Sequence, residues 1–154
     1  MSDSVAKTEA ADVLTEIVLL VFRLEGDFLE AAEAIAEPAG LTAARWKVLG
    51  AVLYEARTVA DIGRAMGLAR QSVQRLADIL AEEGLAAYQE NPAHKSANML
   101  APTKAGRAAI ARLRDRQSRW ANEVSRGFSA KGLASCRDSL SALIARVEEV
   151  ECRR

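Results

Sequence analysis

Residues 58–84 read TVADIGRAMGLARQSVQRLADILAEEG, and this stretch predicts two short helices joined by a tight turn. Thr58, followed three residues later by Asp61, is a variant of the capping box that begins a helix. Gly67 supplies the turn, and Gly84 follows the second helix at a position suited to a left-handed cap. The order helix, turn, helix predicts a helix-turn-helix unit.

Apolar residues of this stretch recur at helical spacing, which indicates where the two helices pack. We expect the contact across the turn to be made by Ile62, Met66 and Leu68. The second helix has a stripe in steps of three and four that we expect to be buried: Val73, Leu76, Ala77 and Leu80.

The other face of the second helix is polar and has no acidic residue near its start. It is formed by Arg70, Gln71, Ser72, Gln74 and Arg75. In a DNA major groove, arginine can pair with guanine N7 and O6, and glutamine can pair with adenine N6 and N7. The alternative is an ordinary solvated helix face, which would more often carry glutamate. The pattern therefore favours a recognition helix.

Residues on both sides of this unit extend it to a winged helix. Thr42 caps a helix predicted over 43–54, on which Trp46 faces the core. After the recognition helix, strand-like runs at 85–89 and 98–101 flank a polar loop. Two such runs with turn residues between them predict a β-hairpin, which would be the wing.

Three side chains on or before the supporting helix are candidates for contacts with backbone phosphates: Arg57, Thr58 and Arg64. Phosphate contacts hold the register of a protein on DNA without reading its sequence. The alternative for each arginine is a surface ion pair, for instance between Arg57 and Glu55.

Long amphipathic helices are predicted at both ends of the chain. Over 12–37 the apolar positions alternate in steps of three and four: Leu14, Ile17, Val21, Leu24, Phe28, Ala31 and Ile35. A helix over 103–126 precedes a last one with the seam Leu133, Cys136, Leu140, Leu143, Val147 and Val150. We expect a two-fold homodimer to bury these seams, with an intrachain bundle as the alternative.

The charge is segregated although the 21 basic and 21 acidic residues cancel. Residues 1–40 carry a net charge of −7, whereas residues 41–77 and 111–154 carry +4 each. A neutral chain of this kind is expected to have little non-specific affinity for DNA and to bind it through one basic face.

Several classes of protein are excluded or disfavoured. The longest apolar run, Ile17–Phe22, is far shorter than the roughly 20 residues that span a membrane, and no secretory signal opens the chain. Two cysteines and one histidine exclude a disulfide framework and a multi-histidine metal site. No set of catalytic groups stands out. We expect a cytoplasmic protein that is not an enzyme and has no metal or cofactor. Cys136 is predicted to be structural, and Cys152 to be a candidate for an intersubunit link.

A series of short motifs follows a fixed order along residues 41–106: Leu41-Thr42, Trp46 with Leu49, Ile62-Gly63, Met66-Gly67-Leu68, Val73-Gln74-Arg75-Leu76, Leu80, Gly84-Leu85, Asn91-Pro92, and Leu100, Thr103 and Gly106. In this order they resemble the winged helix-turn-helix transcription factors of the multiple antibiotic resistance regulator (MarR) family. The resemblance implies a mainly α fold with a small β-wing. It implies an N-terminal dimerisation helix over 1–40, the DNA-binding domain over 41–102, and C-terminal dimerisation helices over 103–154.

The resemblance also implies a function. A protein of this family would be a dimeric, sequence-specific regulator that represses transcription from a pseudo-palindromic operator in duplex DNA. A small, often phenolic, ligand would release it. The groove-reading positions fall on the polar face defined above. The alternative function is a winged-helix module that binds a ligand or a protein and has little affinity for DNA.

Two departures from the family pattern concern DNA binding. The wing falls on residues 91–98 and lacks the usual arginines, so that Lys95, helped by His94, is the cationic candidate. Ala69 occupies the position where a serine or threonine commonly caps the recognition helix.

The effector pocket of the family lies between the dimerisation helices and the winged helix. By placement, the candidates are Arg23, Phe28 and Trp46. The alternatives are local pairing of Arg23 with Asp27 and a core position for Trp46.

Overall fold

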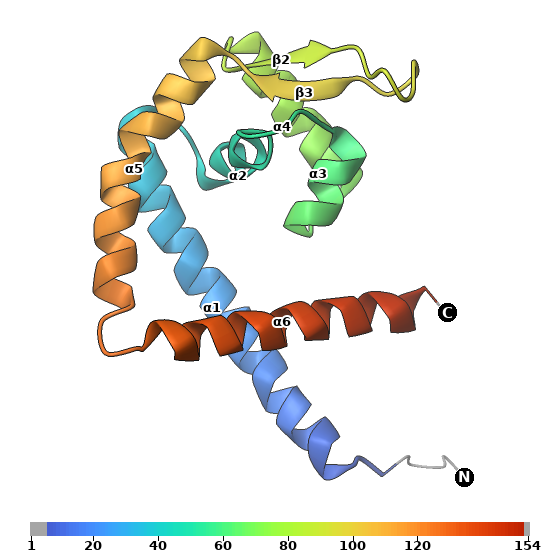
Figure 1. The fold of residues 1–154 in the computed structure, drawn as a ribbon, viewed down its shortest axis with the longest axis vertical. Coiled ribbons are helices and arrows are strands. Elements are labelled where there is room, and N and C mark those ends of the chain that lie inside the picture. Colours follow the sequence, from blue (N-terminus) through green and yellow to red (C-terminus); the bar gives the residue numbers. More distant parts are fainter. Residues whose placement is uncertain (1–5, 153–154) are drawn as a thin grey trace. The chain divides into compact units, whose positions relative to one another are not determined.

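A computed structural model describes residues 6–152, and its elements are mainly helical (Figure 1). The first of two compact units ends at Arg116, and the second begins at Gln117. In chain order the elements are α1 (Glu9–Ala36), the 3-10 helix η1 (Glu37–Ala39), α2 (Ala43–Ala51), β1 (Arg57–Thr58), α3 (Val59–Met66), α4 (Arg70–Glu82), β2 (Ala86–Gln89), β3 (Met99–Pro102), α5 (Lys104–Val124) and α6 (Ala130–Glu151). Over the described residues, none of the helices is long and apolar enough to cross a membrane.

The helix-turn-helix forms as predicted, with local caps at its ends. The Thr58 hydroxyl accepts a hydrogen bond from the Asp61 amide at 3.2 Å and donates one to the Asp61 carboxylate at 2.6 Å. Gly67 has the left-handed conformation, with φ of 63°. A Cβ atom on Gly63 would come within 2.8 Å of the carbonyl oxygen of Leu68, so a glycine permits this close approach of the turn to α3.

The core of the winged helix is formed by fully buried apolar side chains from α2, α3, α4 and β3, including Leu49, Ile62, Val73, Ala77, Leu80 and Leu100. Two expectations were wrong in detail. Met66, the last residue of α3, is exposed rather than packed across the turn, and Leu76 is only half-buried. Trp46 is likewise half-buried.

Helix α2 begins after its predicted cap, Thr42, but ends at Ala51 rather than Tyr54. The helix stops because Leu53 donates its amide to the Gly50 carbonyl, in a turn that places Val52 in the core. Tyr54 is left almost fully exposed.

The sheet has three antiparallel strands in the order β1-β3-β2, where the sequence predicted two. Strands β2 and β3 form the predicted hairpin, with Tyr88 opposite Leu100. Strand β1 is the addition, and it pairs Arg57 with Leu100. Strand β1 has only two residues, which is too short for a periodic sequence pattern, so it is recognised as a strand only by its pairing with β3.

The junction of α4, β2 and α5 is formed by the motif residues Gly84, Leu85, Thr103 and Gly106. Gly84 has φ of 71°, and the Leu85 amide closes the end of α4 on the Leu80 carbonyl at 2.8 Å. The Thr103 hydroxyl donates to the Gly84 carbonyl at 2.6 Å and accepts from the Gly106 amide at 3.1 Å. Thr103 therefore caps α5 and ties it to the end of α4.

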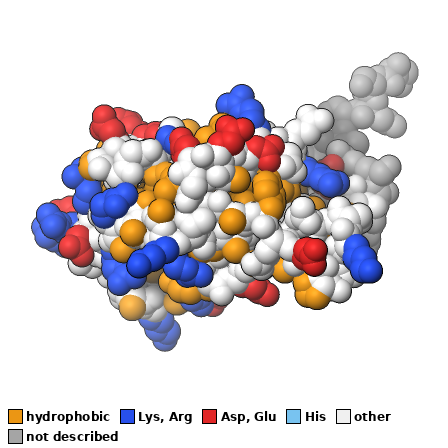
Figure 2. All heavy atoms as spheres, turned by 90° about the horizontal axis from the view of Figure 1, so that it is seen from above, with side chains coloured by type: hydrophobic (Ala, Val, Ile, Leu, Met, Phe, Trp, Pro, Cys, Tyr) orange, Lys and Arg blue, Asp and Glu red, His pale blue; other side chains and the backbone are white. Residues whose placement is uncertain are grey.

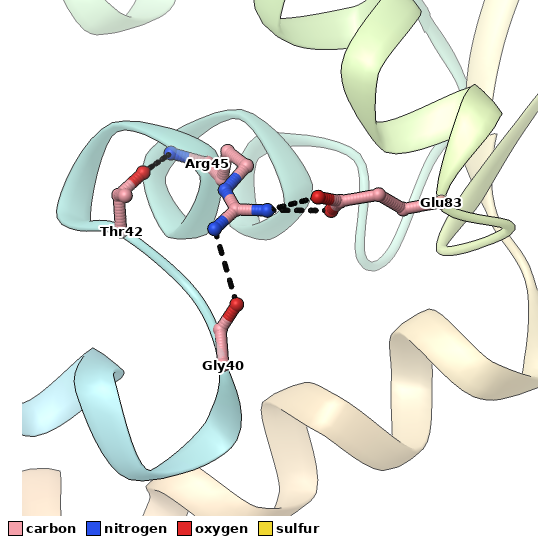
Figure 3. A network of polar contacts seen from close by, with 4 residues as sticks. All are labelled: Gly40, Thr42, Arg45 and Glu83. Atoms are coloured by element: carbon pink, nitrogen blue, oxygen red, sulfur yellow. Dashed lines mark hydrogen bonds and ion pairs between the residues drawn. The ribbon is translucent and has the colours of Figure 1, made fainter.

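A network around Arg45 joins the start of the winged helix to the end of α4 (Figure 3). The Arg45 guanidinium donates to both carboxylate oxygens of Glu83, at 2.6 Å to Oε2, and to the Gly40 carbonyl at 3.1 Å. Its side chain is 18% exposed. Arg45 thus contributes to the positive charge of residues 41–77 but not to an outer basic surface.

In the second compact unit, α6 begins at its cap Ser129, whose hydroxyl accepts from the Gly132 amide at 3.0 Å. The helix carries the predicted apolar seam, but no residue on it is buried. Cys136 and Cys152 are exposed free thiols. The expectation that Cys136 is structural assumes that a dimer buries this seam, and it stays a prediction.

Candidate nucleic-acid interface

Helix α4 presents its polar face to solvent. Its members are all exposed: Arg70, Gln71, Ser72, Gln74 and Arg75. Val73, Ala77 and Leu80 on the opposite face are buried, and they fix the rotation of the helix about its axis. The helix begins after Ala69, which makes no side-chain cap, so its first turn keeps unsatisfied amide groups at the end where the polar face starts. The geometry suits the approach of a polyanion.

Gln74 is held by two other side chains, and sequence reasoning missed both. Its Nε2 atom donates to Asp78 Oδ1 at 2.9 Å and to the Tyr88 hydroxyl at 2.8 Å, and Tyr88 donates to Asp78 at 2.6 Å. Burial raises the pKa of Tyr88 to about 12, and the hydrogen bond and negative charge of Asp78 add to the effect. Asp78 stands four residues after Gln74, a spacing that signals a helical pair. Tyr88 comes from β2, and no local pattern indicates it.

The candidates for phosphate contacts have partners inside the chain. Arg57 lies 4.0 Å from Glu55, the alternative considered from the sequence, and Arg64 forms an ion pair with Asp61. The Thr58 hydroxyl is used in capping α3. The Arg64 side chain is 73% exposed, and such surface pairs contribute at most about 1 kcal/mol, so a phosphate can replace the carboxylate.

The wing loop connects β2 and β3 (Figure 1). Asn91 begins it with a local turn, because its side-chain oxygen accepts from the Ala93 amide at 2.9 Å. The Ala97 amide donates to the His94 carbonyl at 3.2 Å. His94 and Lys95, which are neighbours in the sequence, are both exposed at this turn.

Charges of both signs are interspersed with apolar surface on the face shown in Figure 2, and they do not form one continuous basic field. This distribution agrees with the zero net charge of the chain.

The effector candidates lie on two helices of the first unit. Arg23 and Phe28 are on the exposed part of α1, and Trp46 is half-buried on α2. Within the described residues, Arg23 has no ion pair with Asp27, the alternative weighed from the sequence. The buried end of α1, at Ile35, lies about 18 Å along the helix from Arg23, at ~1.5 Å per residue.

Comparison with known proteins agrees with this architecture. A sequence profile described as MarR family matches residues 39–95. An uncharacterized protein of Mycobacterium tuberculosis is 34% identical over 134 residues, which are 87% of this chain and 94% of that protein.

Two solved structures are similar along most of their length. CouR from Rhodococcus jostii RHA1, bound to p-coumaroyl-CoA, has a TM-score of 0.70 at 25% identity and covers 83% of this chain and 91% of its own. Wild-type MarR from E. coli, in its apo form, has a TM-score of 0.66 at 18% identity and covers 80% of this chain and 93% of its own. The second similarity is one of fold. With its capped helix-turn-helix, its exposed polar face on α4 and its β-wing, the chain belongs to the MarR family of DNA-binding transcription regulators.

Proposed function

We propose that the chain is a homodimeric repressor that reads a pseudo-palindromic operator with the polar face of α4. The observation that carries this proposal is the exposure of five polar, non-acidic side chains at the start of that helix, opposite a fully buried stripe. Arginine and glutamine side chains there match the donors and acceptors of base edges in the major groove.

Contacts outside α4 would position the protein. Arg57, Thr58 and Arg64 would lie along one stretch of backbone phosphates, and His94 and Lys95 would approach a neighbouring groove from the wing. A lysine is a strongly hydrated point charge and a weaker probe of a narrow minor groove than an arginine. We therefore expect the wing to add less affinity than α4.

The homodimer is supported by helix α1. Its exposed apolar side chains extend beyond the predicted seam, and Leu19, Leu20 and Phe22 are 64–66% exposed in the single chain. A helix that is apolar around most of its circumference requires burial on several sides. A second copy of the same chain would provide an equivalent surface, as two-fold dimers do.

A small aromatic ligand is proposed as the effector, with Arg23 to hold an anionic group and Phe28 and Trp46 to contact a ring. The similarity to CouR, whose structure holds p-coumaroyl-CoA, supports an aromatic compound as the first to test. The measurement is tryptophan fluorescence during titration with aromatic acids, in the wild type and in Arg23→Ala. A panel that leaves both emission and operator binding unchanged would count against the effector.

A gel-shift titration with the DNA upstream of the protein's own reading frame tests the DNA-binding face. Arg70→Ala and Gln74→Ala should each lower the affinity, by about 1–3 kcal/mol for a bidentate base contact, or roughly 5- to 150-fold. Arg137→Ala, an exposed arginine on α6, is the matched control and should change affinity less than twofold. Equal binding by all variants would exclude α4 as the reading helix. No salt-dependent binding by the wild type would favour the module that binds a ligand or a protein instead.

A further inference from the structure

Arg45 lies between the end of α1 and the end of α4 and bonds to both regions (Figure 3). Its Nη1 atom donates to both carboxylate oxygens of Glu83, at 2.6 Å to Oε2, and its Nη2 atom donates to the Gly40 carbonyl at 3.1 Å. Gly40 ends η1, which directly follows α1, and Glu83 directly follows α4. One guanidinium therefore joins the end of α1 to the recognition helix.

Both partners of Arg45 belong to closed turns. Gly40 has the left-handed conformation, with φ of 72°, and its amide donates to the Glu37 carbonyl at 2.9 Å. The Glu83 amide donates to the Ile79 carbonyl at 2.9 Å, in the last turn of α4. Because both turns are closed, a rotation of α4 against α1 is resisted by the bonds that Arg45 makes.

The apolar contacts at this junction restrict such a rotation less. Ile35, Ala36 and Leu41 are buried there, but the gain from burial depends on the area removed from water and has no preferred direction. Hydrogen bonds weaken steeply when their angle changes. The Arg45 side chain is only 18% exposed, so water competes little for its bonds. Arg45 thus supplies directional bonds to a junction that is otherwise held by burial.

Resting on the proposed function, we propose that Arg45 is a positioning residue that fixes the angle between α1 and α4, and thereby the spacing of the two half-sites that the dimer accepts. In helix-turn-helix dimers this spacing follows from geometry. In the proposed dimer the two α1 helices are joined, so the angle between α1 and α4 decides how far apart the reading helices lie. One base pair added between the half-sites moves one of them by about 3.4 Å and turns it by about 35°.

The guanidinium is suited to this role because its donor atoms are separate. Nη1 bonds to Glu83 and Nη2 to Gly40. A lysine ends in one compact ammonium on a flexible stem, so Arg45→Lys keeps the charge and loses the pair of separated donors. Glu83→Gln keeps the size of the acceptor and removes its charge, which weakens the other side of the connection. Neither change alters a side chain of the polar face.

The test begins with duplexes that the wild type selects from a pool of randomised sequences. One base pair is added or removed between the half-sites of a selected duplex, and the affinity for each spacing is measured by gel shift. The wild type should prefer the selected spacing by about tenfold, the lower end for a hydrogen bond to a charged group. Arg45→Lys and Glu83→Gln should each reduce this preference to about threefold or less, since that bond is lost or weakened. Affinity for a duplex with a single half-site should not change, because the base contacts of α4 are untouched.

Controls separate this inference from a general structural role and from the proposed function. Arg137→Lys, in an ion pair whose arginine side chain is 72% exposed, is the matched control and should keep the wild-type preference. Circular dichroism checks the fold of each variant, and if Arg45→Lys is unfolded, Glu83→Gln alone decides. An equal loss of affinity for every spacing and for the single half-site would overturn the inference, as would an unchanged preference or a wild type that tolerates all spacings. DNA reading by α4 would then still stand. A wild type that selects no sequence, or binds as a monomer, would overturn the proposed function and the inference with it.

A measurement without DNA follows the same angle. Ser72 is exposed on α4, and a spin label on Ser72→Cys, in a chain with Cys136→Ala and Cys152→Ala, reports the distance between the two copies of α4 in the dimer by pulsed electron spin resonance. The distribution of this distance should broaden in Arg45→Lys and stay unchanged in Arg137→Lys. Equally narrow distributions in the two variants would contradict the positioning role of Arg45, whatever the protein does on DNA.

Discussion

The winged helix and helix α1 differ in the burial of their apolar side chains. Leu49, Ile62 and Leu80 of the winged helix are fully buried within one chain, whereas Leu20 and Phe22 of α1 are each 66% exposed. The winged helix is complete as a single copy, because helices α2, α3 and α4 and the sheet cover one another. Helix α1 is long and apolar, and its buried residues, Ile35 and Ala36, lie at its end. The difference teaches that the apolar core of the winged helix closes within one chain, whereas burial of the α1 side chains depends on the proposed dimer.

Exchanging glycines for alanine in the two regions should give the largest contrast. A Cβ atom on Gly106 would lie 1.9 Å from the Leu85 carbonyl oxygen, and neither backbone can move without disturbing the Thr103 junction. Gly106→Ala should therefore lower the free energy of unfolding by about 3–5 kcal/mol. In α1, Gly26 has nothing within 4 Å of that position, and Gly26→Ala should raise stability by up to about 1 kcal/mol.

Both variants are compared with the wild type by urea denaturation at one protein concentration. If Gly26→Ala and Gly106→Ala lowered the free energy of unfolding by similar amounts, the contrast between α1 and the winged helix would be wrong. Such a result would show that α1 is packed as tightly as the α4–α5 junction.

Leucine substitutions should separate folding from assembly. Leu80→Ala removes a fully buried side chain and should cost about 3 kcal/mol through the lost contacts and the cavity, with the oligomeric state unchanged. Leu20→Asp places a charge on the exposed apolar part of α1 and should shift dimers toward monomers while the winged helix stays folded. Sedimentation velocity and thermal unfolding of both variants check this. A monomeric wild type, or a Leu20→Asp dimer of unchanged affinity, would contradict the role given to α1.

The smallest effect expected is a pH dependence at the start of α3. The hydrogen bond from Thr58, followed by the charge of Arg64, lowers the pKa of Asp61. Because the folded-state pKa is lowered, the ionised carboxylate stabilises the folded chain above the ordinary aspartate pKa of about 4, and this contribution is lost as the pH falls through the folded-state pKa. Asp61→Asn should be less stable than the wild type at neutral pH, and the two should converge in acid. Thermal unfolding across this range measures it, and Glu55→Gln, an exposed carboxyl without a capping role, is the control.

Sequence reasoning succeeded where the deciding interactions are local. The cap of α3 involves residues three apart, and the left-handed turns at Gly67 and Gly84 depend on the absence of a Cβ atom. Sequence reasoning was less accurate where contacts with distant segments of the chain determine the structure. The end of α2 was placed three residues too late, because Val52 leaves the helix to fill the core.

The same distinction between local and distant interactions applies to the candidate site. The exposed face of α4 follows from helical periodicity, since burying Val73, Ala77 and Leu80 turns the other side to solvent. Helical periodicity does not predict which partners the polar side chains of the winged helix contact. Glu83 removes Arg45 from the outer surface across 38 residues of chain, and Tyr88 restrains Gln74 across 14.

The sequence by itself determined the order of the helices, the caps of α2 and α3, the turn glycines and the polar face of α4, because each depends on residues within a few positions of one another. Only the tertiary structure decided that Arg57 and Thr58 pair with β3, that the Gln74 amide contacts Tyr88 of β2, and that apolar side chains such as Leu20 and Phe22 of α1 are exposed. These features depend on which distant segments come into contact when the chain folds around its core, and local sequence patterns do not predict those contacts.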